Sequence, residues 1–324
     1  MRRAILAAFT LITIVAFGGG LAHGQTYPNK PITMVVPYAA GGTAEVLGRI
    51  LAQQLGDVLG QSIVVEIKAG AGSMIGAEYV AKIAKPDGYT ILFTGNPIAI
   101  NVALMNLSFD PVKDLAPVAG IAAFPSILVT SATSPYMTLA DVIKASKTTH
   151  LTFGSSGPGT HSHMSGELVK AMSHFDMTHV PYKGSGPVYP DLIAGRISVL
   201  FDTSASAIGF INGGKVRALG ITSKERSKAT PNIPTIAEQG VPGFEALTWF
   251  GVFVPSSTPP AIVTHLERAI YKVVQSPAFA SRLDQWAGLP LPAEPTAAGF
   301  GRFYRNEVQD WEKLVRDGKV KRLD

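Results

Sequence analysis

A local pattern recurs along this chain: an apolar strand, a turn rich in glycine, serine or threonine, and then an amphipathic helix. It occurs at residues 33–43 and 151–160, and comparable turns follow predicted strands at 95–96 and 202–206. This succession predicts an α/β protein with parallel sheets and right-handed crossovers. The turns would lie at the carboxyl ends of the strands, where unpaired N–H groups and helix dipoles favour an anion.

The composition of the turns indicates which kind of anion. The glycines at 41 and 42 could serve only to ease a tight bend, but the repetition of such turns favours binding. None of the four turns contains lysine or arginine, so backbone N–H groups, hydroxyls, the Asn96 amide and water would hold the ligand. This suits a carboxylate better than a polyphosphate. The nearest cation is Lys183, which could equally be a solvated turn residue.

Asp202 is a second negative charge beside the predicted anion site, and two roles remain open for it. The favoured one is a helix N-cap whose carboxylate accepts from the N–H groups of its own helix. In the alternative, Asp202 accepts a hydrogen bond from a ligand ammonium, a hydroxyl or a bound water.

Residues 1–24 are interpreted as a secretory signal. Arg2 and Arg3 precede an apolar stretch at 4–17, and Ala22-His23-Gly24 forms a cleavage site. The apolar run is shorter than the ~20 residues that a spanning helix needs, which favours cleavage over a membrane anchor. The chain has no cysteine, so disulfides and cysteine-linked lipid are excluded. An exported, unanchored protein fits a Gram-negative periplasm.

Several functions are disfavoured by composition and spacing. Without the signal the net charge is only about +3, too small to indicate nucleic-acid binding. The histidines between 161 and 179 have no carboxylate at metal-ligand spacing, so no metal is expected. The glycines at 70, 72 and 76 depart from a dinucleotide fingerprint, so no cofactor is expected. No nucleophile motif is recognisable, which argues against an enzyme.

The chain is long enough for two cores. Residues 115–130 and 247–254 read as extended segments that pass from one lobe to the other. We therefore expect lobe 1 to comprise residues 25–124 plus 248–324 and lobe 2 to comprise 125–247. Two crossings between two doubly wound sheets would form a hinge, and a hinge creates a cleft.

An ordered series of motifs runs over nearly the whole mature chain. The motifs are Tyr27-Pro28, Val36-Pro37 to Thr43, Gly70-Ala71-Gly72, Pro86-Asp87-Gly88-Tyr89-Thr90, Phe109 to Leu115, His179 to Pro187, Arg217 to Gly220, Pro234-Thr235 to Glu238 and Trp249 to Gly251. In these motifs the chain resembles the Bug family of periplasmic solute receptors, the binding proteins of tripartite tricarboxylate transport systems. The resemblance implies a two-lobed, type II-like Venus-flytrap receptor, expected to be a monomer, that presents a small carboxylate to membrane permease subunits. The sequence departs from the family at Ala40, Glu45, Ile67 and 155–157, and these departures concern the identity of the ligand rather than the mode of binding.

The expected function is therefore capture of a di- or tricarboxylate, or a related organic acid, between two lobes for transport. A receptor for a signalling partner and, less favoured, an enzyme acting in the same cleft are the alternatives. The expected ligand-binding residues are Tyr38, Ala39, Ala40, Gly41, Gly42, Thr43, Asn96, Ser155, Ser156, Gly159, Thr160, His161 and Asp202.

Overall fold

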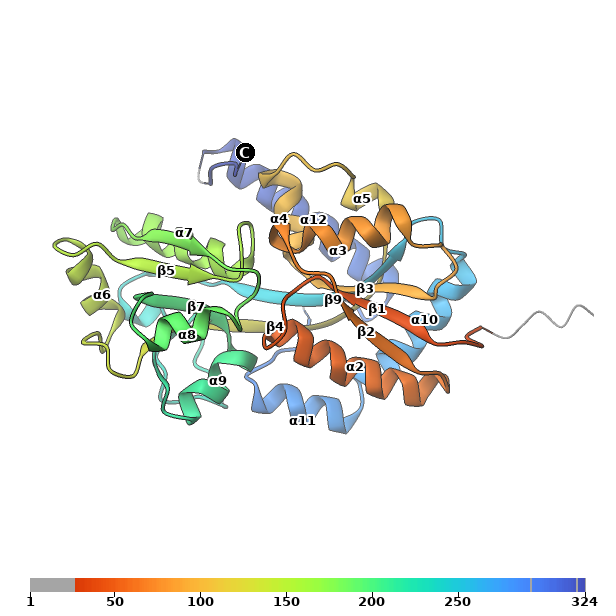
Figure 1. Ribbon diagram of the computed structural model, residues 1–324, viewed down its shortest axis with the longest axis horizontal. Helices are drawn as coiled ribbons and strands as arrows, with labels where there is room; N and C mark the ends of the chain where they lie inside the picture. The colour runs from red at the N-terminus through yellow and green to blue at the C-terminus, as the bar shows by residue number, and fades with distance from the viewer. Residues whose placement is uncertain (1–26, 292, 319, 324) are drawn as a thin grey trace, which may run out of the picture.

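Two lobes lie side by side and are crossed by two long strands (Figure 1). The computed structural model describes residues 27–291, 293–318 and 320–323. The predicted signal at residues 1–24 lies outside these ranges. No helix within them is both long enough and apolar enough to span a membrane.

The first lobe is built on three parallel strands, β1 (Ile32–Val36), β2 (Ile63–Ile67) and β3 (Thr90–Gly95), as the sequence predicts. Between β1 and β2 runs α2 (Thr43–Leu59), whose residues Leu47, Leu51 and Leu55 are fully buried against the sheet. This is the apolar stripe expected of an amphipathic helix. The other helical segments of this lobe are η2 (Ala71–Ser73), α3 (Met74–Glu78), η3 (Tyr79–Ile83), α4 (Pro97–Leu104), α5 (Pro111–Asp114), α10 (Pro260–Val274), α11 (Pro277–Gln285) and α12 (Ala297–Arg316).

The second lobe repeats the design. Its parallel strands are β5 (Thr152–Ser155), β6 (Thr178–Pro181) and β7 (Val199–Thr203), while β8 (Val216–Ile221) pairs antiparallel with a crossing strand. A capping box of Thr138 and Asp141 starts the first helix of this lobe. The helices are α6 (Leu139–Ser146), α7 (His161–Ser173), α8 (Val188–Ile193), α9 (Ser204–Asn212) and η4 (Ala237–Gln239).

The crossing strands, β4 (Leu115–Ser131) and β9 (Leu247–Pro255), run antiparallel to each other. β9 also pairs with β3, and β4 pairs with β7, so the two lobes share one mixed nine-stranded sheet in the order β2-β1-β3-β9-β4-β7-β5-β6, with β8 on β4. The expected two-lobed α/β fold with two crossing strands is confirmed, and the crossing strands join the parallel strands of the two lobes into one mixed sheet. A strand that leaves a lobe and one that returns run in opposite directions, and here they pair along their length.

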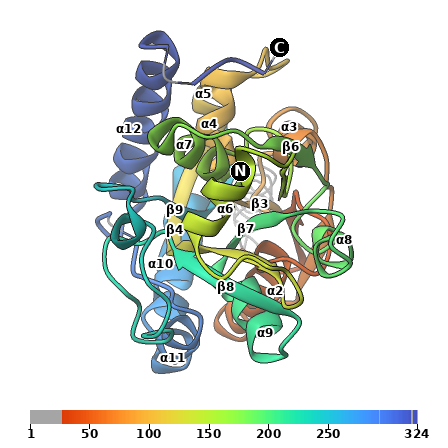
Figure 2. The same ribbon diagram turned by 90° about the vertical axis from the view of Figure 1, so that its left-hand side faces the viewer.

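The hinge lies where the partners of β4 change. Residues up to Pro125 pair with β9, and residues from Ser126 pair with β7 in the second lobe. This change falls beside the predicted boundary at 124/125, although the boundaries themselves stay a prediction. Viewed along the crossing strands, α4, α5 and α12 lie above them and α2, α9 and α11 lie below (Figure 2). Helices thus cover both faces of the sheet.

Candidate functional site

Four helices begin at one small cavity between the lobes. It has a volume of about 50 Å³ and is lined by the first residues of α2 and α4 from the first lobe and of α7 and α9 from the second. A cavity of this size holds a few waters or a carboxylate-sized group. Among the predicted site residues, those that line it are Tyr38, Ala39, Gly42, Thr43, Asn96, Ser156, Thr160, His161 and Asp202.

None of these four helices has a side-chain cap at its N-terminus. Of the other described α-helices, α5, α6, α11 and α12 are each capped by an Asp, Thr or Ser side chain, whereas α3, α8 and α10 are not. An uncapped N-terminus leaves N–H groups unpaired and carries about half a positive charge. The cavity therefore gathers the positive ends of several dipoles although no lysine or arginine lines it.

Thr43, at the start of α2, has its hydroxyl directed to this environment without a partner. Its residue is 6% exposed, and its Oγ1 makes no hydrogen bond within the described part of the chain. A buried unpaired hydroxyl costs free energy unless something else satisfies it. Thr43 lines this cavity and also the cavity beside Gly41.

The turn between β1 and α2 uses some of its N–H groups internally, which the sequence pattern does not reveal. The Gly41 N–H donates to Glu45 Oε2 at 3.0 Å, and the Ala39 N–H donates across the lobe boundary to the Lys183 carbonyl oxygen at 3.0 Å. Neither group is available to an anion. The hydrogen bonds of Gly41 and the Arg49 side chain lower the pKa of Glu45, so this carboxylate stays charged.

Asn96 and His161 meet across the lobe boundary. Asn96 Oδ1 accepts from Thr248 at 2.9 Å, and its Nδ2 lies 3.4 Å from His161 Nδ1. Burial lowers the pKa of His161 to about 4, so the ring is neutral at pH 7. Its Nδ1 therefore accepts from the Asn96 amide, and its Nε2 faces Ser165 at 3.3 Å.

Asp202 is not the helix cap that the sequence favoured. It lies in β7, and Thr203 is the N-cap of α9. Its carboxylate accepts from the Tyr189 hydroxyl at 2.7 Å and from the Thr203 N–H at 2.8 Å. Burial raises the pKa of Asp202, which is 3% exposed. The strand extends farther than expected because residues 199–203 continue the ladder with β4.

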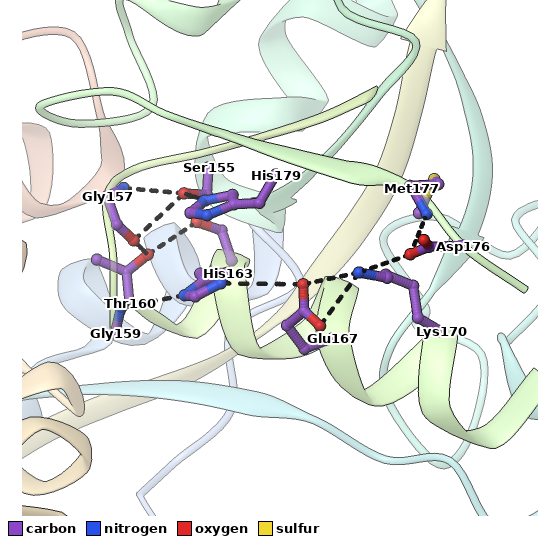
Figure 3. Close-up of polar contacts among 11 residues, drawn as sticks. Ser155, Gly157, Gly159, Thr160, His163, Glu167, Lys170, Asp176, Met177 and His179 are labelled. Atoms are coloured by element: carbon purple, nitrogen blue, oxygen red, sulfur yellow. Dashed lines mark hydrogen bonds and ion pairs between the residues drawn. The ribbon is translucent and has the colours of Figure 1, made fainter. Parts of the chain in front are cut away.

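The turn after β5 rests on two stacked histidines (Figure 3). The rings of His163 and His179 lie 3.8 Å apart, and both stack near Phe153. The Gly159 N–H donates to His163 Nδ1 at 3.2 Å, and Ser155 Oγ lies 2.6 Å from His179 Nε2. Burial lowers the pKa of His163 to about 3 and that of His179 to about 4. Both rings are neutral at pH 7 and position the turn from behind.

Four predicted site residues do not line the cavity. Ser155 is fully buried beneath its turn, and Gly159 packs against Asn101 of the first lobe. Gly41 lines a different cavity. Ala40 is at the exposed tip of its loop, where its carbonyl oxygen faces Gly186.

The segment after β6 contributes to the site, and sequence reasoning missed it. Gly184 and Ser185 line the cavity, and Gly186 lies against Ala40 and Gly41 of the opposite lobe. The glycine-rich run after a strand was a usable signal, since it repeats the pattern of the other turns. The remaining lining residues not predicted are Ala44, Pro97, Ser162, Thr203, Thr248 and Phe250.

The chain is similar to known proteins over nearly its whole length. The protein family described as the tripartite tricarboxylate transporter family receptor matches this chain over residues 47–319. The chain is 34% identical to protein BugT of Bordetella pertussis over 322 residues, which cover 98% of each chain.

Two solved structures are similar in fold and sequence. A Rhodopseudomonas palustris protein with adipate has a TM-score of 0.86 and 33% identity, covering 92% of this chain and all of that one. MatC of the same organism, with bound malate, has a TM-score of 0.84 and 31% identity, covering 89% of this chain and all of that one. The chain belongs to the Bug family of receptors for tripartite tricarboxylate transporters.

Proposed function

We propose that this protein captures a small organic dicarboxylate between its lobes and delivers it to a tripartite permease. The observation that carries the proposal is the convergence of four uncapped helix N-termini on one cavity that no cationic side chain lines. Such a site binds a carboxylate through N–H groups, hydroxyls and dipoles. The adipate and malate of the two similar structures support the dicarboxylate class.

Closure of the lobes would follow from contacts that the ligand makes to both of them at once. Thr43 and Asn96 approach from the first lobe, while Thr160 and His161 approach from the second. A ligand held by both sets favours the arrangement in which the lobes touch. The expected affinity therefore depends on the contacts between lobes as well as on contacts to the ligand.

We place the mature protein in the periplasm as a monomer, on the basis of the family and of the predicted signal at residues 1–24. Transport is favoured over sensing because the family consists of transporter receptors. Loss of the protein should abolish uptake of the acid that it binds, whereas a sensor would leave the uptake machinery itself intact.

Two serine–histidine pairs lie near the cleft, and neither supports an enzymatic role. Ser165 Oγ lies 3.3 Å from His161 Nε2, but Ser165 is fully buried and does not line the cavity. Ser155 Oγ lies 2.6 Å from His179 Nε2, but Ser155 is fully buried and does not line the cavity. A nucleophile has to reach the substrate. We therefore assign the Ser155–His179 pair to positioning the turn and propose that the protein is not an enzyme.

The test is a thermal-shift screen of residues 25–324, unfolded and refolded first to remove any retained ligand. The panel contains mono-, di- and tricarboxylates, each dicarboxylate paired with its neutral diamide. A ligand at 100-fold its Kd adds about 2.7 kcal/mol of stability. A shift with a diacid and none with its diamide supports the proposal. No shift with any carboxylate, or an equal shift with the diamide, contradicts it.

A further inference from the structure

A second, larger cavity adjoins the first. It has a volume of about 190 Å³. It lies between the turn at 70–73 of the first lobe and two segments of the second lobe, the turn after β5 and the segment after β6. Tyr38 and Ser156 line both cavities, so they form the wall between them. Because the first cavity accommodates little more than one carboxyl group, the rest of a larger ligand needs space beyond it.

The second cavity contains a buried polar group with hydrogen-bonding capacity to spare. Ser73 is 3% exposed, and its Oγ lies near the Tyr38 hydroxyl but forms no well-aligned hydrogen bond within the described ranges. The turn that holds it is unusual, because Ala71 and Ser73 both have positive φ values, of 46° and 78°. Such conformations are costly for residues with a Cβ and occur at binding sites. The Ser73 hydroxyl is a ready donor to a ligand oxygen.

The second cavity also has the cation that the first one lacks. Lys183 lines it, and its exposed side chain forms no ion pair within the described residues. The backbone of Lys183 is fixed beside Tyr38, because its carbonyl oxygen accepts the Ala39 N–H from the opposite lobe. A lysine therefore lines one of the two adjoining cavities, and helix N-termini line the other.

We propose that the ligand is an extended dicarboxylate, with one carboxylate among the helix N-termini and the other past Tyr38, beside Lys183 and Ser73. This inference rests on the proposed carboxylate-binding function. It distinguishes the two ends of the ligand: dipoles and hydroxyls bind the first carboxylate, and an ion pair selects the second. Short diacids would fill the first cavity without reaching Lys183.

The experiment measures Kd by calorimetry for straight-chain diacids of three to seven carbons and for the monoacids of equal length. The proteins are wild type, Lys183→Gln, Ser73→Ala and the control Lys224→Gln, which changes an exposed lysine that lines neither cavity. Affinity should rise with diacid length. Lys183→Gln should weaken the best long diacid about fivefold, as expected for an exposed ion pair, and leave the monoacids unchanged. Ser73→Ala should weaken the same diacid.

Three outcomes overturn the inference. The first is equal affinity for short and long diacids, which would mean that the second cavity holds only water. The second is an equal effect of Lys183→Gln on monoacids and diacids, or an equal effect of Lys224→Gln, which would indicate general electrostatics. In both cases the carboxylate-binding function stands. In the third, no acid of any length binds, and the proposed function fails together with this inference.

Discussion

Replacing Gly186 with alanine should block closure of the lobes without disturbing either lobe. A Cβ at this position would lie 2.6 Å from the Ala40 carbonyl oxygen and 3.3 Å from Gly41, both in the opposite lobe. The φ angle of Gly186 is not in the left-handed region, so alanine adds no backbone strain. The substitution therefore acts on the contact between lobes.

The size of the effect follows from this geometry. Carbon and oxygen atoms in contact lie about 3.3 Å apart, so the loops must separate by roughly 0.7 Å. The bond from the Ala39 N–H to the Lys183 carbonyl, now 3.0 Å, would then be too long to hold. Overpacking of this kind costs about 1 to 3 kcal/mol. Because only the closed form binds tightly, Kd should rise about 5- to 150-fold.

The assay is calorimetry with the dicarboxylate that gives the largest thermal shift. The matched control is Gly209→Ala in α9, where an added Cβ meets nothing within 4 Å. Both variants should melt within a few degrees of wild type without ligand, and only Gly186→Ala should lose affinity. A Kd for Gly186→Ala within twofold of the Gly209→Ala value would refute the view that this contact governs closure.

The remaining predictions concern charge and hydrogen bonding. Thr43→Val should leave the stability of the ligand-free protein unchanged or slightly higher, since an unpaired buried hydroxyl is lost. The same substitution should raise Kd about tenfold or more. Equal Kd values for the variant and the wild type would show that Thr43 Oγ1 does not reach the ligand. Asp202→Asn should tighten carboxylate binding at pH 8, where the buried wild-type carboxylate repels an anion. The gain in affinity should shrink as the pH falls, because the wild-type Asp202 then gains a proton. Weaker binding by the variant would mean that Asp202 accepts a hydrogen bond from the ligand. Burial lowers the pKa of His163 to about 3 in the folded protein, against about 6.5 in the unfolded chain. The unfolded chain therefore binds the proton more readily below pH 6.5, and the free energy of unfolding falls by about 2 kcal/mol between pH 7 and pH 5. His163→Phe should remove this part of the loss between pH 7 and 5 in urea titrations, whereas the exposed control His265→Gln should not; identical slopes for both would contradict the assignment.

The sequence predicted those parts of the molecule that local patterns encode. The strands that precede the four turns, the two long crossing segments and the helix that starts at Thr43 all follow from the spacing of apolar residues and from glycine-rich turns, whereas β6 was not predicted. The convergence of these turns also follows, because the carboxyl ends of parallel strands meet at one edge of a sheet.

Contacts between distant segments could not be predicted in this way. The hydrogen bond from the Ala39 N–H to the Lys183 carbonyl oxygen depends on the closed position of the lobes. The spacing of residues in the sequence cannot predict it. The Gly41 N–H is taken by Glu45, at a position where the sequence departs from its family. Asp202 was assigned to a cap because local rules favour aspartate there, but pairing with β4 extended the strand past it.

The place of β9 in the sheet has a consequence for how the molecule is made. β9 lies between β3 and β4, yet it is synthesised after every strand of the second lobe. Until residues 247–255 leave the ribosome, β3 has β1 as a neighbour but lacks its second neighbour, and the helices α10 to α12 that cover this part of the sheet do not yet exist. Since domains fold as units once their parts are present, the lobe that begins the chain is the last to be completed. A nascent chain of this topology therefore cannot complete the sheet of its first lobe until residues 247–255 have been synthesised.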